Sequence, residues 1–156
     1  MISCEEQSWM TAEADMNRQH FQFEKSIRLN VTNETRDAHK VLVKYAVRSA
    51  DAKILRQEEQ WVEVPALSSS WLEKVELPEI DCFNEYVSYE AWENDQIISQ
   101  GTVIFSYSKY FHYLDPKLAV RVEGDEIVVA ADAYSQRVWK SEMKQKIWCW
   151  KIITLI

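Results

Sequence analysis

The chain has few of the residues that build linkers and turns, with only two glycines and three prolines among its 156 residues. Flexible linkers are rich in glycine and serine and stiff ones in proline, so we expect no interdomain linker and no low-complexity segment. Two glycines also exclude a glycine-rich loop of the kind that cradles phosphate groups. The length therefore suits one domain, or one domain and part of a second.

Cysteines and long apolar runs are equally scarce. Cys4, Cys82 and Cys149 are odd in number and have no motif spacing, and the opening residues MISCEE lack the apolar core of a signal peptide. We therefore expect free thiols and a cytoplasmic location. No apolar run approaches the roughly 20 residues that span a bilayer. The formal charge of −7 argues against nucleic acid or an anionic membrane as the partner.

The three histidines do not suggest a metal centre or a nucleophile–histidine site. His20, His39 and His112 are scattered along the chain, whereas a zinc site needs convergent nitrogen, sulfur or oxygen ligands. We therefore expect no metal and no cofactor.

The acidic residues do not form an evident catalytic pair. Glycoside hydrolysis needs two carboxylates about 5–10 Å apart across a cleft. Glu58 and Glu59 are neighbours on a predicted strand, so their side chains point to opposite faces. Glu123, Asp125 and Glu126 fall at a predicted hairpin tip, where acids are usually solvated. We expect no catalytic residue in this chain.

What the chain does have is strict alternation of apolar and polar residues, clearest over residues 85–106. Two alternating runs flank Asn94 and Asp95, whose short side chains tolerate positive φ and suit a tight turn. This pattern predicts a β-hairpin. Gly101 lies inside the second strand and indicates a bulge or a close approach of another group to the backbone.

Further strands are predicted before this hairpin, and turn residues separate them about every ten positions. The predicted strands cover residues 21–31, 40–48, 54–64 and 71–77, with a loop at residues 67–70. Such spacing is typical of an antiparallel, immunoglobulin-like β-sandwich. We expect Trp61, Trp71 and Trp92 in its core.

The sandwich is predicted to occupy residues 21–106 and to have incomplete neighbours on both sides. Residues 1–20 are acidic and weakly patterned, with a weak helical signal over residues 12–19, and we interpret them as an N-terminal tether. After the sandwich, residues 107–156 contain two further predicted strands, at 118–123 and 126–134. The fold class is therefore all-β, an immunoglobulin-like sandwich followed by a truncated second β unit.

Four aromatic residues at the start of the second unit are candidates for carbohydrate binding. Rings such as these can stack against the C–H face of a sugar. The alternative, which we favour, is that they pack the junction between the two β units. The four are Tyr107, Tyr110, Phe111 and Tyr113.

Several short motifs occur in a familiar order. They are residues 30–35 (NVTNET), 62–69 (VEVPALSS), 99–103 (SQGTV), 114–118 (LDPKL) and 131–134 (ADAY). Together they resemble the C-terminal β-sandwich region of family 2 glycoside hydrolases of the β-mannosidase type, over roughly residues 21–138.

The resemblance implies a function for the chain. In that family a catalytic (β/α)8 barrel precedes the immunoglobulin-like domains and carries two catalytic glutamates, neither of which has a counterpart here. The resemblance therefore implies a non-catalytic accessory region, inactive alone, whose partner is the upstream barrel of a parent enzyme. Two alternatives stay open. One is a carbohydrate-binding module, and the other is a homo-oligomerisation domain that exchanges strands through unpaired sheet edges.

The C-terminal tail departs from the family. Residues 143–156 carry three lysines and no acidic residue, although the whole chain is acidic. Read one nucleotide earlier, suitable codons for this tail can encode DETKDLVLEDNYFD, whose end resembles the family's next motif. We hypothesise a single-nucleotide frameshift near Val138, which makes the tail atypical from about residue 139. A divergent natural tail is the alternative.

Overall fold

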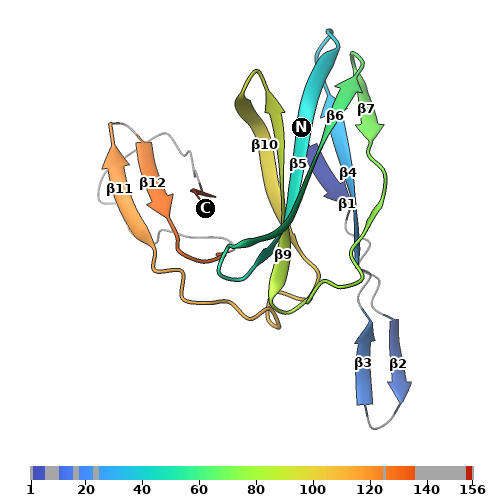
Figure 1. The fold of residues 1–156 in the computed structure, drawn as a ribbon, viewed down its shortest axis with the longest axis vertical. Helices are drawn as coiled ribbons and strands as arrows, with labels where there is room; N and C mark the ends of the chain where they lie inside the picture. The colour runs from blue at the N-terminus through green and yellow to red at the C-terminus, as the bar shows by residue number, and fades with distance from the viewer. Residues whose placement is uncertain are drawn as a thin grey trace. The chain divides into compact units, whose positions relative to one another are not determined.

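The computed structural model describes residues 2–5, 11–15, 18–22, 25–124, 126–135 and 154–155. Every regular element in these ranges is a strand (Figure 1), which confirms the all-β prediction. The described residues include no helix long and apolar enough to cross a membrane. The chain divides into two compact units, Met1–Ser49 with Ile54–Phe111 and Ala50–Lys53 with His112–Ile156. The domain boundary expected after Ser106 stays a prediction.

The first unit is a sandwich of two antiparallel sheets. One sheet has the order β10-β9-β5-β6, and in the other β4 pairs with β1, β7 and β8. A separate antiparallel pair is formed by β2 and β3. The strands are β1 (Ile2–Glu5), β2 (Thr11–Asp15), β3 (Arg18–Gln22), β4 (Ser26–Asn33), β5 (His39–Ser49), β6 (Ile54–Val64), β7 (Ser68–Trp71), β8 (Val75–Glu76), β9 (Glu85–Glu93) and β10 (Gln96–Ile104).

The second unit is smaller. Its strands are β11 (Ala119–Glu123), β12 (Glu126–Ala130) and β13 (Thr154–Leu155). β11 and β12 form an antiparallel hairpin, and β13 pairs in parallel with β12. Within this unit the Tyr113 and Tyr134 rings stack, with centroids 6.1 Å apart and planes 14° from parallel. The frameshift hypothesis falls on residues that, apart from the backbone of Thr154–Leu155, lie outside the described range.

The core of the first unit follows from the period-two alternation of its strands. On β5 the side chains of Val41, Val43 and Val47 point inward and are buried. They pack with apolar residues of the opposite sheet, such as Ile27 and Leu29 of β4, in one cluster. Burying alternate residues from two facing sheets is how a sandwich stabilises itself, and the immunoglobulin-like architecture predicted from sequence is confirmed.

The β9–β10 hairpin has the expected turn, with positive φ at Asn94 (49°) and Asp95 (61°). For Gly101 the sequence predicts a bulge or a close approach of another group to the backbone, and the structure shows a close approach. The phenol ring of Tyr89 lies directly over this glycine, so that an added Cβ would be 2.5 Å from the ring atom Cζ. The bulge lies elsewhere, where the pairing shifts and Ile98 becomes the extra residue of β10.

Two local predictions are wrong. The helical signal over residues 12–19 is overridden, because β2 and β3 pair there as strands. The serine-rich loop at residues 67–70 contains most of β7, and the strand expected over residues 71–77 is divided between β7 and β8. Both short strands pair with β4. The hydrogen bonds that β4 offers on that side thus outweigh the low strand preference of serine.

The prediction that Trp61, Trp71 and Trp92 lie in the core is also wrong. Trp61 is 58% exposed, Trp71 is 42% exposed and Trp92 is half-buried. Trp61 and Trp92 both pair with Leu42 of β5, and Leu42 lies on the face opposite to the buried valines. Cations lie over the three rings instead of core side chains, each about 5 Å from a ring centroid: Arg28 over Trp71, Lys40 over Trp61 and Lys44 over Trp92.

Candidate binding site

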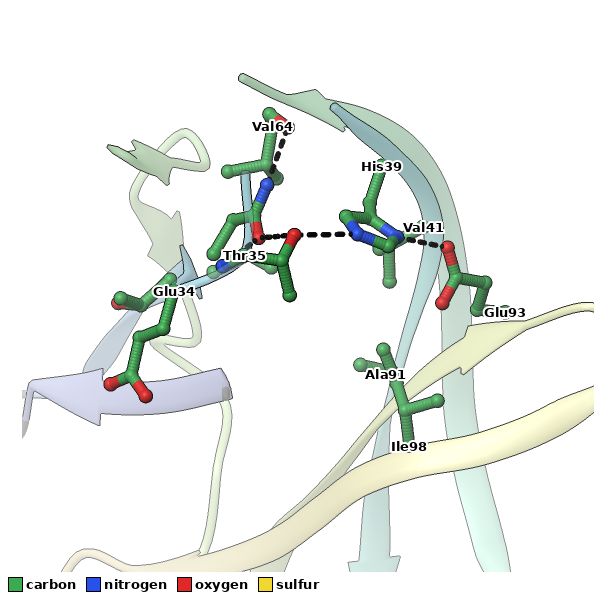
Figure 2. A pocket seen from close by; sticks show the side chains of 11 residues that line it. Glu34, Thr35, His39, Val41, Val64, Ala91, Glu93 and Ile98 are labelled. Atoms are coloured by element: carbon green, nitrogen blue, oxygen red, sulfur yellow. Dashed lines mark hydrogen bonds and ion pairs between the residues drawn. The ribbon is translucent and has the colours of Figure 1, made fainter. Parts of the chain in front are cut away.

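A pocket of about 300 Å3 opens between the two sheets of the first unit. It lies where β4, β6 and β9 end and β5 begins (Figure 2). Buried side chains of Val31, Val41, Val64 and Ala91 contribute to its wall, together with the bulged Ile98. Polar side chains from the β4–β5 loop and from the starts and ends of the strands complete the lining.

Asn33 holds one side of this pocket together. Its Oδ1 accepts hydrogen bonds from the backbone N–H of Thr35 (2.9 Å) and from the Thr35 hydroxyl (2.7 Å). Its Nδ2 donates to the carbonyl oxygens of Asp37 (2.8 Å), Pro65 (3.0 Å) and Val64 (3.3 Å). Asparagine favours such turns because its side chain bonds to the backbone two residues further on. This one buried amide therefore fixes the β4–β5 loop to the end of β6.

His39 continues this network across the pocket. Its Nδ1 lies 2.6 Å from Oε1 of Glu93, and its Nε2 lies 2.8 Å from Oγ1 of Thr35. In a neutral ring, Nδ1–H donates to the carboxylate and Nε2 accepts from the Thr35 hydroxyl. In a protonated ring both nitrogens donate, and the hydroxyl turns to Asn33 Oδ1. Figure 2 shows Thr35, His39 and Glu93 in one line, with Ala91 and Ile98 below it in the view.

The order hydroxyl, imidazole, carboxylate resembles a nucleophile with its base and orienting acid. The local bonds argue against that use. The Thr35 hydroxyl has Asn33 Oδ1 and the Asp37 carbonyl (3.1 Å) as competing acceptors. The backbone N–H of Thr35 is already bonded to Asn33, so it is not available to an oxyanion as such catalysis requires. The hydrogen bonds of these three residues connect the β4–β5 loop to the end of β9.

Carboxylates do not face one another across this pocket. Figure 2 shows Glu34 and Glu93 at its opposite ends, with the Glu34 carboxylate directed away from His39. Within the part of the chain that the structure describes, no group of three or more His, Cys, Asp or Glu residues could hold a metal ion. The pocket offers hydrogen-bonding groups and apolar side chains to a ligand.

Glu58 and Glu59 point to opposite faces of β6, as predicted. The Glu58 carboxylate accepts hydrogen bonds from the Tyr45 phenol and the Arg56 guanidinium on the inner face. Glu59 faces outward, with its Oε2 3.7 Å from the Lys44 ammonium. Burial, and then the hydrogen bond to Glu58, raise the pKa of Tyr45 to about 12. The hydrogen bonds from Tyr45 and then Arg56 lower the pKa of Glu58.

The other residues singled out from sequence are not gathered at the pocket. His112 is exposed in the second unit. The side chains of His20, Glu123, Asp125 and Glu126 lie outside the described residues.

The four candidate aromatic residues have different environments. Tyr107 and Tyr110 of the first unit are exposed by 50% and 38%, and their rings are tilted by 59° with centroids 6.3 Å apart. The Lys109 ammonium lies 4.6 Å from the Tyr110 ring centroid. Phe111 is buried, and Tyr113 belongs to the second unit. Tyr107 and Tyr110 thus do not form a coplanar platform, and sugar binding by the four residues stays a prediction.

Sequence reasoning missed His39 and Glu93 as a pair. The two residues are 54 positions apart, and only the antiparallel pairing of β5 with β9 brings them together. The one local signal was the NET sequence at residues 33–35, which marks the turn. It does not show that the turn meets a histidine and a glutamate.

Three comparisons with known proteins bear on this fold. The family model described as "Mannosidase Ig/CBM-like domain" matches residues 25–110, which run from just before β4 to just beyond β10. No curated protein sequence matches the chain.

Among solved structures, a β-D-mannosidase from Dictyoglomus thermophilum superimposes with a TM-score of 0.59 at 17% identity, over 85% of this chain. A β-glucuronidase from Bacteroides uniformis gives a TM-score of 0.41 at 15% identity, over 69% of this chain. The chain spans 15% of the length of the mannosidase and 14% of the length of the glucuronidase.

Proposed function

This chain belongs to the Mannosidase Ig/CBM-like domain family, and on that basis we propose that it is the non-catalytic accessory β-sandwich of a glycoside hydrolase of the β-mannosidase type. The observation that carries this proposal is the family match over residues 25–110, which contains the whole described core of the first unit. The likeness to a β-mannosidase of which the chain spans only 15% supports a role as one part of a larger enzyme. The partner would be the catalytic barrel of that enzyme.

The arrangement of the acids supports a non-catalytic role. Hydrolysis of a glycosidic bond uses two carboxylates about 5–10 Å apart on either side of the bond. Glu58 and Glu59 point to opposite faces, and Glu34 and Glu93 lie at opposite ends of the pocket (Figure 2). Glu93 is also bonded to His39. Neither pair faces a common point where a sugar bond could lie.

The test is a hydrolysis assay with the purified chain and p-nitrophenyl β-D-mannopyranoside. We expect release of nitrophenol at the rate of the buffer blank, while a complete β-mannosidase at the same concentration is active. Release above the blank that is lost in Glu93→Gln or Glu58→Gln would refute the proposal and identify the carboxylate. Release unaffected by both substitutions, and removed by further purification, would indicate a contaminating enzyme and leave the expected result intact.

A carbohydrate-binding module is the second candidate, and one observation favours it. Tyr107 and Tyr110 are both exposed and adjacent on the surface of the first unit, and exposed rings can stack on sugars. Titration with mannobiose, followed by intrinsic fluorescence, tests it. A saturable change at millimolar sugar that disappears in Tyr110→Ala would support this role, and an unchanged signal would reject it.

A further inference from the structure

The pocket beside His39 has an aliphatic wall. Val31, Val41, Val64 and Ala91 are at most 3% exposed, and the bulge in β10 aims Ile98 at the same space. Bulges commonly redirect a side chain next to a functional site. Among the described residues that line the pocket, none is phenylalanine, tyrosine or tryptophan. The wall therefore suits a flexible alkyl chain better than the C–H face of a sugar, which usually stacks on an aromatic ring.

The polar side of the pocket offers hydrogen-bond acceptors, whereas the side-chain donors of Asn33 and His39 are already hydrogen-bonded. The Asn33 amide hydrogens are bonded to three backbone carbonyl groups, and both ring nitrogens of His39 are engaged. Within the described part of the chain, the Glu93 carboxylate has His39 as its one side-chain partner. Figure 2 shows its second oxygen on the side nearer Ala91 and Ile98. This oxygen is well placed for a donor that also carries positive charge.

We propose that the pocket binds a small alkylammonium ion, with its ammonium group on the Glu93 carboxylate and its alkyl chain against the aliphatic wall. Charge complementarity selects this class. The hydroxyl of a sugar or an alcohol could also donate to this carboxylate, but it carries no charge and makes the weaker hydrogen bond. A carboxylate ligand would meet like charge. Glu34, at the other end of the pocket, adds negative charge to the same region.

The size of the pocket limits the ligand. A volume of about 300 Å3 is at the lower end of the range found for small-molecule sites. A chain of about four carbons, as in n-butylammonium, is thus a suitable probe. So small a ligand makes few contacts, and its expected dissociation constant is on the order of millimolar. The site does not depend on the accessory role proposed above.

The experiment uses the full 156-residue chain near neutral pH, with carbon-13 methyl spectra recorded as n-butylammonium chloride is added. We expect saturable shifts at Val41, Ala91 and Ile98, and weaker binding of n-butanol by at least about fivefold, because a charged hydrogen bond is lost. Butyrate should not bind. Sodium chloride at the same concentrations corrects for ionic strength.

Matched variants test the role of the carboxylate. Glu93→Gln should weaken n-butylammonium binding by about fivefold or more and leave the affinity for n-butanol unchanged. Glu90→Gln, three positions earlier on β9 and outside the pocket lining, should change neither. Ile98→Ser, at a half-exposed position, should weaken both ligands alike. It keeps the test informative if Glu93→Gln does not fold.

Four outcomes would overturn the proposal. The first is the lack of saturable methyl shifts up to about 50 mM probe, well above the expected millimolar range. The second is equal affinity for n-butanol and n-butylammonium, which would mean an apolar cavity without charge recognition. The third is an equal effect of Glu93→Gln and Glu90→Gln. The fourth is tighter binding of mannose than of n-butylammonium at the same methyl groups, which would identify a sugar site.

Discussion

Replacing Gly101 by alanine should destabilise the first unit, although alanine is normally the better strand residue. An added Cβ would lie 2.5 Å from Cζ and 3.0 Å from Cε2 of Tyr89, where ordinary contacts begin at 3.4 Å. The ring must therefore move by about 1 Å, a shift that a close-packed interior resists. Tyr89 packs against the core cluster, so its displacement also disturbs the residues below it.

The magnitude follows from two opposing effects. Overpacking at a well-packed site costs about 1–3 kcal/mol of unfolding free energy. The conformational advantage of alanine over glycine offsets about 0.5–1 kcal/mol of this loss. We expect a net loss of about 1–2 kcal/mol. With a urea m-value of about 1–3 kcal/mol/M, the midpoint of unfolding should fall by roughly 0.5–1 M.

A double-mutant cycle separates this clash from other effects. Urea unfolding, followed by fluorescence of the seven tryptophans, is measured for Gly101→Ala, Tyr89→Ala and the double variant. Without the ring, Gly101→Ala should stabilise by about 0.5–1 kcal/mol, which gives a coupling of about 1.5–3 kcal/mol between the two positions. Gln100→Ala, on the same strand and exposed, should change stability by less than about 0.5 kcal/mol. An equal loss from Gly101→Ala in both backgrounds would refute the reasoning.

Three further predictions follow from residues with different burial. Asn33→Ala should cost about 1–3 kcal/mol of unfolding free energy, because the buried Val64 carbonyl and two partly buried carbonyl groups lose their donor. Asn84→Ala, at an exposed turn, should cost far less, and urea unfolding measures both. In an ultraviolet pH titration, the Tyr45 phenol should ionise near pH 12, so the absorbance change near that pH should be smaller by one phenol in Tyr45→Phe. Trp61→Ala should cost less than about 1 kcal/mol, and Leu29→Ala about 2–5 kcal/mol, in thermal or urea unfolding.

The raised pKa of Tyr45 predicts how the unfolding free energy depends on pH. A pKa raised from 10.0 to about 12 in the folded chain means that the phenol keeps its proton more tightly when folded. The stabilisation is thus fully present below pH 10 and is lost as the pH rises through 12. Tyr45→Phe should lower the unfolding free energy at pH 8 and flatten its decline above pH 10. A decline of equal slope in wild type and variant would contradict this assignment.

The parts of the fold that were predicted correctly are those in which local pattern and burial agree. β6 has the predicted bounds, Ile54–Val64, and β5 extends the predicted strand by one residue at each end. The turn at Asn94 and Asp95 has the positive φ values that its residue types favour. In these segments the alternation that defines the strand is also the alternation that fills the core.

The errors occurred where pairing with a distant strand decides the structure. Residues 68–70 are serines, yet they form a strand because β4 offers hydrogen bonds to them. The tryptophans were placed in the core because large apolar residues are usually buried. Trp61 and Trp92 instead pair with Leu42 on the outer face of their sheet. Which of the two alternating faces meets the second sheet depends on long-range packing, which local sequence does not reveal.

The pocket could not be predicted for a related reason. Asn33 and Thr35 form a turn that local sequence does indicate. His39 and Glu93 become partners only through the β5–β9 pairing, and Ile98 reaches the pocket only because the register shifts beside it. Each of these features depends on the partner or the register of a strand, and local patterns in a single sequence do not predict them.

Strand β6 allows a last prediction, on the oligomeric state. It ends its sheet, so among the described strands it has a neighbour in that sheet on one side only. Arg56 and Glu58 lie on its inner face, where a second chain pairing with β6 would bury them. Removing such charges from water is costly, and inward-facing charges are a known protection of edge strands.

We therefore expect light scattering to report a monomer for the wild-type chain, which would argue against the strand-exchange alternative. The double variant Arg56→Thr with Glu58→Val should associate, because it turns the same edge into an apolar, β-branched template. The matched control is the double variant Lys53→Thr with Asp51→Val, which also removes one positive and one negative charge but lies in the β5–β6 turn. It should remain monomeric. The opposite result would be a wild-type dimer that persists in both double variants. It would show that the chains associate through another surface and that the charges on β6 do not protect this edge.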